Sequence, residues 1–160
     1  MKIGFIGLGN MATAIIGGLL REDTALSSED GNATVITAAN IIGSAKTEAT
    51  RQKRAEHVAV VAVCVLFKIR QRALVEHLLV ERGLEVDLLV LAVKPQFFPE
   101  VIAEIRDAVS ENTLVISIAA GLTLERIAGL FDRNVTAMRL IRCMPNTPAL
   151  VNAGCTAVVP

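Results

Sequence analysis

The sequence of 160 residues lacks tryptophan and tyrosine altogether and has five phenylalanines. Proteins that bind nucleic acid commonly stack bases on aromatic side chains and carry an excess of Lys and Arg. Here 16 basic and 16 acidic residues give a net charge of zero. The composition therefore argues against nucleic acid as a partner and leaves little scope for an aromatic ligand cage.

Long hydrophobic runs are also lacking, because the longest, Val58 to Phe67, has ten residues, whereas a helix needs about 20 to span a bilayer. We therefore expect no membrane segment. The three cysteines, at positions 64, 143 and 155, are odd in number and lack the spacing of metal ligands. This usage is typical of reduced thiols. The N-terminal stretch has no cleavage-type end, so it does not resemble a signal peptide. We accordingly predict a cytoplasmic protein without a metal site.

What the chain does have is a regular alternation of apolar, strand-like segments with amphipathic, helix-like segments. Predicted strands cover residues 2–6, one of 35–37 and 41–42, then 87–93, 114–119, 135–141 and 155–159. Predicted helices cover residues 13–20, 47–56, 67–82, 100–109 and 123–131, and 21–33 is interpreted as a surface loop. This alternation predicts an α/β fold, with a Rossmann-like, doubly wound, mainly parallel sheet and helices on both faces.

A glycine turn joins the first predicted strand to the first predicted helix. Gly7 permits a sharp turn, Gly9 lacks a Cβ and lets the backbone approach phosphates closely, and Ala12 is small enough for the helix to pack on the strand. The start of the helix offers N–H groups and a positive dipole end to an anion. The turn therefore predicts a site for the pyrophosphate of a dinucleotide, with a turn that serves packing alone as the alternative.

The end of the second strand selects between the two nicotinamide cofactors, since an acidic residue there binds the ribose 2′-hydroxyl of NAD. If that strand is 41–42, residues 41–46 have no acid at that place. Ser44 can donate a hydrogen bond, and Lys46 and Arg51 can pair with a 2′-phosphate. This pattern favours NADP(H) over NAD(H). If the strand is instead 35–37, Asn40 occupies the selecting position and the argument weakens. Solvated surface charges are the alternative for Lys46 and Arg51.

Three later strand ends carry unusual residues at the edge where open parallel sheets bind ligands. Lys94 and Pro95 place a cation just past a buried strand. The small residues 119–121 allow a flat ring or a ribose to approach the backbone. Asn146 and Thr147 supply one amide and one hydroxyl between two prolines. An ordinary strand-end charge and plain turn chemistry remain the alternatives for these residues.

Taken in order, these segments resemble the pyrroline-5-carboxylate reductases. The segments that carry the resemblance are IGFIGLGNMATAIIGGL, IIGSAKTEATR, DLLVLAVKPQ, LVISIAAGLTLERI and RLIRCMPNTPALVNAGCTAV. The resemblance implies NADPH-dependent reduction of the small molecule 1-pyrroline-5-carboxylate to proline, the last step of proline biosynthesis, by hydride transfer to the carbon of a C=N bond. Another NADP-dependent reductase of the β-hydroxyacid-dehydrogenase-like group is the alternative within this sheet type.

The resemblance also implies a role for particular positions of this sequence. Along the pyrophosphate it places Gly7, Gly9, Asn10 and Met11, next to Ala12. At the adenosine 2′-phosphate it places Ser44 and Lys46. Beside the ribose and nicotinamide it places Ala92, Val93, Lys94 and Pro95, to which the small residues Ala119, Ala120 and Gly121 are added from the strand-end argument. As catalytic residues beside the nicotinamide it implies Asn146 and Thr147.

Two departures from the family's pattern bear on function. Residues 52–85 do not follow the family's short helix, third strand and helix. Val58 to Phe67, followed by a basic helix, has the look of an insertion or a reading-frame slip. The family also has an all-helical domain that forms the homo-oligomer and supplies much of the substrate pocket, and the 160 residues stop before it. We therefore expect one dinucleotide-binding domain over 1–160, with little activity alone. A non-catalytic NADP-binding fragment is the alternative.

Overall fold

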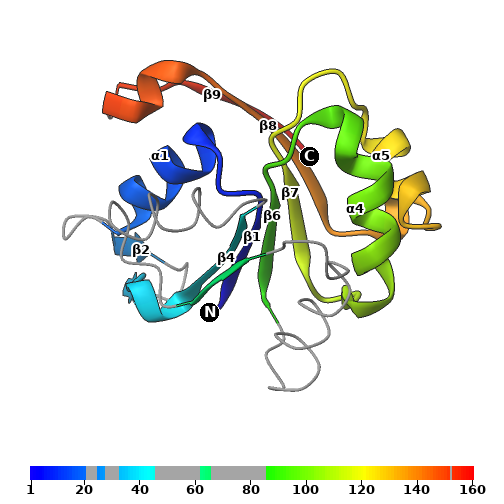
Figure 1. Cartoon of the computed structure of the whole chain (residues 1–160), viewed down its shortest axis with the longest axis horizontal. Helices are drawn as coiled ribbons and strands as arrows, with labels where there is room; N and C mark the ends of the chain where they lie inside the picture. The colour runs from blue at the N-terminus through cyan, green and yellow to red at the C-terminus, as the bar shows by residue number, and fades with distance from the viewer. Residues whose placement is uncertain (21–24, 28–32, 46–61, 66–85, 152) are drawn as a thin grey trace.

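The computed structural model describes residues 1–20, 25–27, 33–45, 62–65, 86–151 and 153–160. Within them, seven strands form one sheet in the order β5-β4-β1-β6-β7-β8-β9, and only β9 runs antiparallel to its neighbour (Figure 1). The strands of the sheet are β1 (Ile3–Ile6), β4 (Ile41–Ala45), β5 (Ala62–Val65), β6 (Leu88–Leu91), β7 (Leu114–Ser117), β8 (Leu140–Pro145) and β9 (Thr156–Val159). Counted along the chain, the six parallel strands have the order 3-2-1-4-5-6 of doubly wound nucleotide-binding folds. The predicted fold class is confirmed.

Helices cover both faces of this sheet (Figure 1). Helix α1 (Asn10–Leu19) packs on one face, where Ile16 is completely buried, and α4 (Phe98–Ile105) and α5 (Leu124–Leu130) pack on the other. Four residues of α4 are buried at helical spacing, namely Phe98, Val101, Ile102 and Ile105, as expected of an amphipathic helix on a sheet. Short 3₁₀ helices are η1 (Ala38–Asn40), η3 (Pro95–Phe97), η4 (Arg106–Ala108), η5 (Val135–Ala137) and η6 (Thr147–Val151).

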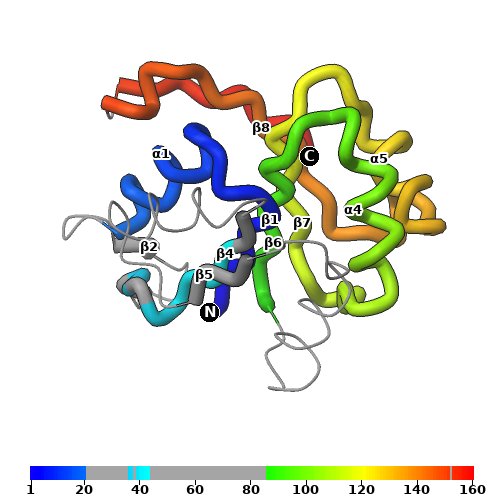
Figure 2. Tube along the Cα trace, viewed as in Figure 1, coloured from blue at the N-terminus to red at the C-terminus, as the bar shows by residue number. Residues whose placement is uncertain are grey.

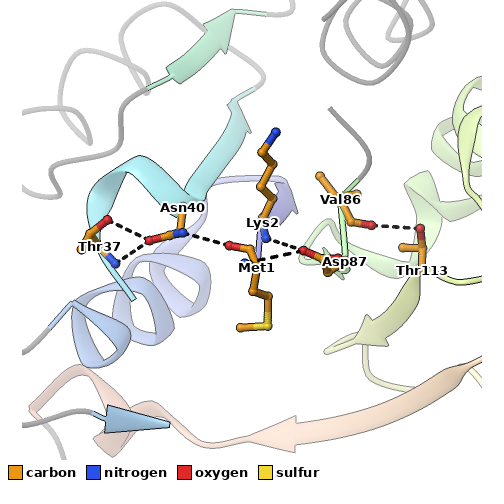
Figure 3. Close-up of polar contacts among 7 residues, drawn as sticks. All are labelled: Met1, Lys2, Thr37, Asn40, Val86, Asp87 and Thr113. Atoms are coloured by element: carbon orange, nitrogen blue, oxygen red, sulfur yellow. Dashed lines mark hydrogen bonds and ion pairs between the residues drawn. The ribbon is translucent and has the colours of Figure 1, made fainter. Parts of the chain in front are cut away.

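Polar contacts at the amino ends of the central strands hold the chain start in place (Figure 3). The Asn40 side-chain amide donates to Met1 O at 2.9 Å, and the Lys2 N–H donates to Asp87 Oδ2 at 2.7 Å. The Met1 ammonium also lies 3.9 Å from the same carboxylate. Residues just before β4 and β6 thus bind the residues just before β1 through hydrogen bonds and an ion pair, and these contacts help to fix the register of the three strands.

The second strand of the sheet is the later of the two candidates. Strand β4 pairs in parallel with β1, with Ile41 opposite Ile3 and Ser44 opposite Ile6. Val35 belongs instead to β3 (Ala33–Val35), which forms a separate antiparallel hairpin with β2 (Ala25–Ser27). Asn40 therefore lies at the amino end of β4, away from the cofactor-selecting position, and the argument for Ser44 keeps its basis.

Three other expectations differ from the structure. Residues 21–33, expected to be a loop, contain β2 and the first residue of β3. The strand expected over 135–141 begins only at Leu140, because Asn134 accepts a hydrogen bond from the Thr136 N–H at 3.1 Å and caps a 3₁₀ turn. Within the supposed insertion, Ala62–Val65 pairs with β4 and takes the third-strand position. The helices expected over 47–56 and 67–82 lie outside the described residues.

Candidate functional site

The expected cofactor positions that the structure describes lie along the edge of the sheet where the strand order reverses. Strand β1 lies between β4 and β6, so the chain leaves the centre of the sheet in both directions from this point. In doubly wound sheets, the crevice beyond the carboxyl ends at such a switch point holds the ligand. The glycine turn after β1, the end of β4, and the segments after β6 and β7 all meet this edge.

Gly7 is required by the fold itself. Its φ is +95°, a conformation that side chains strain to adopt, and a Cβ there would lie 2.9 Å from Val93 Cγ1 and 3.0 Å from Ala92 O. The Ala92 N–H donates to Ile6 O at 2.9 Å on the same side. The turn after β1 is therefore pressed against the segment after β6, so two parts of the expected site share one boundary.

Gly9, in contrast, is not required for packing. It is exposed, it precedes α1 as the N-cap with an extended backbone, and a Cβ there would meet nothing within 4 Å. No side chain caps the helix, and its first turn has no acidic residue. Ala12 is buried against the sheet, while Asn10 is exposed and Met11 half-buried. The open backbone at the helix start suits an anion, because helix N-termini present N–H groups and a positive dipole end.

The segment after β6 carries four of the expected cofactor residues, 92–95. Ala92 and Val93 are half-buried, and Lys94 is exposed. Lys94 precedes η3, and its carbonyl accepts a hydrogen bond from the Phe97 N–H at 2.9 Å. Pro95 then starts the 3₁₀ helix, with its fixed φ suited to that position. The Lys94 backbone thus lies in a hydrogen-bonded turn that directly follows Ala92 and Val93, the residues packed against Gly7.

The small residues after β7 lie on the other side of β6. Ser117 is fully buried, and its hydroxyl accepts a hydrogen bond from the Ala119 N–H at 3.3 Å. Ala119 is buried, Ala120 is exposed, and Gly121 has a φ of +74° with open space where a Cβ would lie. A flat ring has room to approach the backbone at Gly121. Lys46, at the far end of the predicted site, lies outside the described residues.

Asn146 closes the loop between β8 and β9. Its side-chain oxygen accepts a hydrogen bond from the Cys155 N–H at 2.9 Å, and its own N–H donates to Cys155 O at 3.2 Å. The loop is tight, since a Cβ on Gly154 would lie 2.8 Å from Ala149 Cα. Asn146 and Thr147 are both exposed. Asn146 therefore has a structural task that the motif alone does not reveal.

The same loop brings its 3₁₀ helix, η6, against α1. Figure 2 shows the trace leaving β8, passing α1 and returning along β9. The predicted reaction-site loop thus lies beside the helix whose start forms the predicted pyrophosphate site.

Burial raises the pKa of the Cys143 thiol in β8 above its usual range, so this side chain stays protonated at neutral pH.

Arg142 is a residue at this edge that the motifs did not single out. It lies opposite Ser117 in the β7–β8 register, and its Nε is buried without a hydrogen-bond partner in the part of the chain that the structure describes. A buried guanidinium nitrogen without an acceptor is costly. In the sequence, Arg142 is a charged residue directly after the strand predicted over 135–141, within the segment RLIRCMPNTPALVNAGCTAV.

Neither a metal site nor a membrane span is found in the described ranges. No three His, Cys, Asp or Glu side chains there are grouped to hold a metal ion. None of the helices described is long and apolar enough to cross a bilayer.

Comparison with known proteins identifies the family. A family model described as NADP oxidoreductase, coenzyme F420-dependent, matches residues 2–121. The chain belongs to this family. The match covers the glycine turn, the end of β4 and the segments after β6 and β7. It therefore includes every expected cofactor position and stops before Asn146.

Similarity extends over nearly the whole chain in proteins named pyrroline-5-carboxylate reductase. The chain is 36% identical to that of Escherichia coli over 159 residues, which are 99% of this chain and 49% of that protein. It is 35% identical to that of Vibrio alginolyticus over 153 residues, 96% of this chain and 46% of that protein. The resemblance inferred from the sequence is confirmed. The chain spans about half the length of these relatives.

Solved structures agree with this result. A pyrroline-5-carboxylate reductase from Coxiella burnetii has a TM-score of 0.71 at 32% identity, covering 98% of this chain and 48% of that one. The Plasmodium falciparum enzyme, solved with NADP bound, has a TM-score of 0.61 at 23% identity, covering 99% of this chain and 47% of that one. At that identity the second likeness concerns the fold alone.

Proposed function

We propose that this chain binds NADP(H) across the carboxyl ends of β1, β4, β6 and β7, and that the protein reduces 1-pyrroline-5-carboxylate to proline in the cytoplasm. The observation that carries the proposal is the 36% identity over 159 residues to the Escherichia coli pyrroline-5-carboxylate reductase. The reduction adds a hydride to the carbon of the C=N bond and a proton to its nitrogen.

The start of α1 would hold the pyrophosphate. Gly9 supports this assignment, because its backbone is open where a Cβ would fill the approach. In our proposal Gly7 shapes the turn, Asn10 and Met11 border the phosphates, and Ala12 keeps the helix close to the sheet. Backbone N–H groups and the helix dipole stabilise the negative charge there.

The two ends of the cofactor would lie on either side of this turn. At the end of β4, Ser44 and Lys46 suit a 2′-phosphate, since no acidic residue of this segment would repel it. On the other side, the expected borders of the ribose and nicotinamide are Ala92, Val93, Lys94, Pro95, Ala119, Ala120 and Gly121. When bound, NADPH supplies the hydride.

Asn146 and Thr147 would complete the site beside the reacting atoms. Their loop is held by two hydrogen bonds between Asn146 and Cys155 and lies against α1. In our proposal the loop orients the imine and excludes water, which raises the rate by positioning. The family's homo-oligomer stays a prediction that follows from the resemblance.

Cofactor binding and turnover test the proposal separately. Binding of NADPH to the purified 160-residue chain is measured by nucleotide fluorescence, and turnover is measured as NADPH oxidation in the presence of 1-pyrroline-5-carboxylate. We expect binding, with slow turnover. Absence of NADPH binding would refute the assigned site. Fast turnover would contradict the expectation of little activity alone.

A second candidate is a chain that binds NADP(H) without catalysis. The observation that favours it is the extent of the family model, which matches residues 2–121 and so includes every expected cofactor position but neither Asn146 nor Thr147. The two candidates share the whole cofactor site and differ in turnover. A 3-hydroxyisobutyrate dehydrogenase from Mycobacterium tuberculosis has the same fold at 15% identity. Testing small hydroxy acids and other cyclic imines as substrates separates this broader reductase group from the proposed reaction.

A further inference from the structure

Gly43 in β4 provides the space that one side chain of the glycine turn occupies. A Cβ at this position would lie 2.7 Å from Leu8 Cδ2, 3.0 Å from Cδ1 and 3.1 Å from Cγ. Gly43 does not have a positive φ, so its backbone would accept other residues. The need for glycine here comes from Leu8.

Leu8 stands between Gly7 and Gly9, so its position fixes the turn that was assigned to the pyrophosphate. Its side chain is 3% exposed and belongs to the core cluster beneath α1. Gly43 lies opposite Phe5 in the sheet and immediately precedes Ser44. The contact between Leu8 and Gly43 therefore joins the turn to the strand whose end was assigned to the 2′-phosphate.

The turn has no room to yield on its other side. The Gly7 backbone is already packed on Ala92 and Val93, as shown by the 2.9 Å and 3.0 Å contacts that a Cβ would make there. Protein interiors are close-packed and transmit such displacements. A methyl group at position 43 must therefore move Leu8, the turn that carries it, or β4.

We propose that Gly43 is a positioning residue for cofactor binding, because it seats Leu8 and thereby sets the phosphate-binding turn. The inference rests on the proposed NADP(H) site and deepens it. Since the pyrophosphate is common to both nicotinamide cofactors, displacement of the turn weakens NADPH and NADH by the same factor.

The test is a double-variant cycle on Gly43 and Leu8. Overpacking by one methyl group in Gly43→Ala weakens NADPH and NADH binding about tenfold. Adding Gly43→Ala to Leu8→Ala, which removes all three clashing atoms, leaves the Kd within about twofold of that of Leu8→Ala. Gly17→Ala is the matched control, since Gly17 is exposed on α1 and a Cβ there meets nothing within 4 Å. Its Kd stays at the wild-type value.

Melting temperatures of the same variants separate positioning from general destabilisation. A lower melting temperature with an unchanged Kd in Gly43→Ala overturns the inference, as does a tenfold loss that persists when Leu8 is Ala. A loss confined to NADPH also overturns it, because the effect would then lie at β4. If Gly43→Ala does not fold, the comparison of Leu8→Ala with the double variant decides alone. Failure of the wild-type chain to bind NADPH rejects the proposed function instead.

Discussion

Any side chain at Gly7 would be strained by the φ of +95° and would also clash with Val93. We expect Gly7→Ala to lower the free energy of unfolding by about 2 kcal/mol or more, since the new methyl group is strained and overpacked. Urea denaturation of the chain without cofactor measures this loss. Gly129→Ala is the control, because a Cβ at that helical position meets nothing within 4 Å. Equal stability of the Gly7→Ala and wild-type chains would contradict the close packing described.

At Gly9, substitution is expected to lower cofactor affinity while leaving stability unchanged. We expect Gly9→Glu to keep the melting temperature of the chain, because its Cβ enters open space and an acid suits a helix start. NADPH affinity falls at least about tenfold, since the carboxylate repels the phosphates. Gly17→Glu places the same charge further along α1 and leaves the affinity unchanged. An unaltered Kd in Gly9→Glu would contradict the proposal that the pyrophosphate binds at this turn.

The glycines differ in how far sequence alone can assign them. Gly9 and the positive φ of Gly7 concern local geometry, so a strand, a turn and a helix start were enough to predict a pyrophosphate site there, whereas the packing of Gly7 on Val93 was not predictable. Gly43 acts through Leu8, and that contact exists only because β4 pairs with β1. Arg142 likewise depends on the register of β7 and β8. Such residues become visible only when the strand pairing is known.

At the scale of elements, α5 shows how one side chain sets a helix start. The Thr123 hydroxyl accepts a hydrogen bond from the Arg126 N–H at 3.2 Å and so caps the helix, which was predicted over 123–131. We expect Thr123→Ala to lower the free energy of unfolding by about 1 kcal/mol through loss of the N-cap. Thr123→Ser keeps the acceptor and retains most of the stability in urea denaturation. Equal losses in both variants would contradict a capping role.

The same helix start has a pH dependence. The Glu125 backbone N–H, and then the Thr123 hydroxyl, hold the pKa of the Glu125 carboxyl below its ordinary value. Because the folded-state pKa is the lower one, this contribution to stability is present above the unfolded-state pKa and is lost as the pH falls through the folded-state pKa. We expect Thr123→Ala to raise the pKa of Glu125 in an NMR titration. Thr123→Ser shifts it less.

In the loop between β8 and β9, two substitutions of Asn146 test whether its side-chain oxygen closes the loop. Asn146→Asp keeps an oxygen acceptor for the Cys155 N–H, whereas Asn146→Ala removes it. We expect hydrogen exchange at the Cys155 amide to accelerate in Asn146→Ala and to stay slow in Asn146→Asp, because only the former loses the hydrogen bond. Fast exchange in both variants would show that the side-chain oxygen does not close the loop.

The type of an element was predicted correctly where one residue pattern dominated its sequence, and wrongly where two patterns competed. The apolar run over 87–93 is consistent with a buried strand alone, and β6 lies within it. Residues Val135 to Ile141 are as β-prone as a strand, yet the Asn134 side chain diverts their start into a 3₁₀ turn. For β5, pairing with β4 decides the outcome, because an apolar run alone does not distinguish an edge strand from an insertion.

For the whole molecule, the sheet order places the proposed cofactor across strands that are distant in sequence. The ends of β4, β1, β6 and β7 lie side by side, and the loop after β8 reaches α1. A ligand that contacts all of these segments binds only the folded chain, so its binding energy adds to the stability of the entire sheet. The alternation of elements predicted this class of fold, while the strand order had to come from the structure.

The stabilisation by cofactor therefore reports on both the site and its selectivity. At about 100 times its Kd, NADPH should add about 2.7 kcal/mol to the free energy of unfolding. NADH at the same concentration should add less, since it lacks the 2′-phosphate that Ser44 and Lys46 are expected to bind. Thermal denaturation with each cofactor measures the difference, and Ser44→Asp should reverse it by accepting the 2′-hydroxyl and repelling the phosphate. If NADH stabilises the wild-type chain as much as NADPH does, the end of β4 does not select the cofactor.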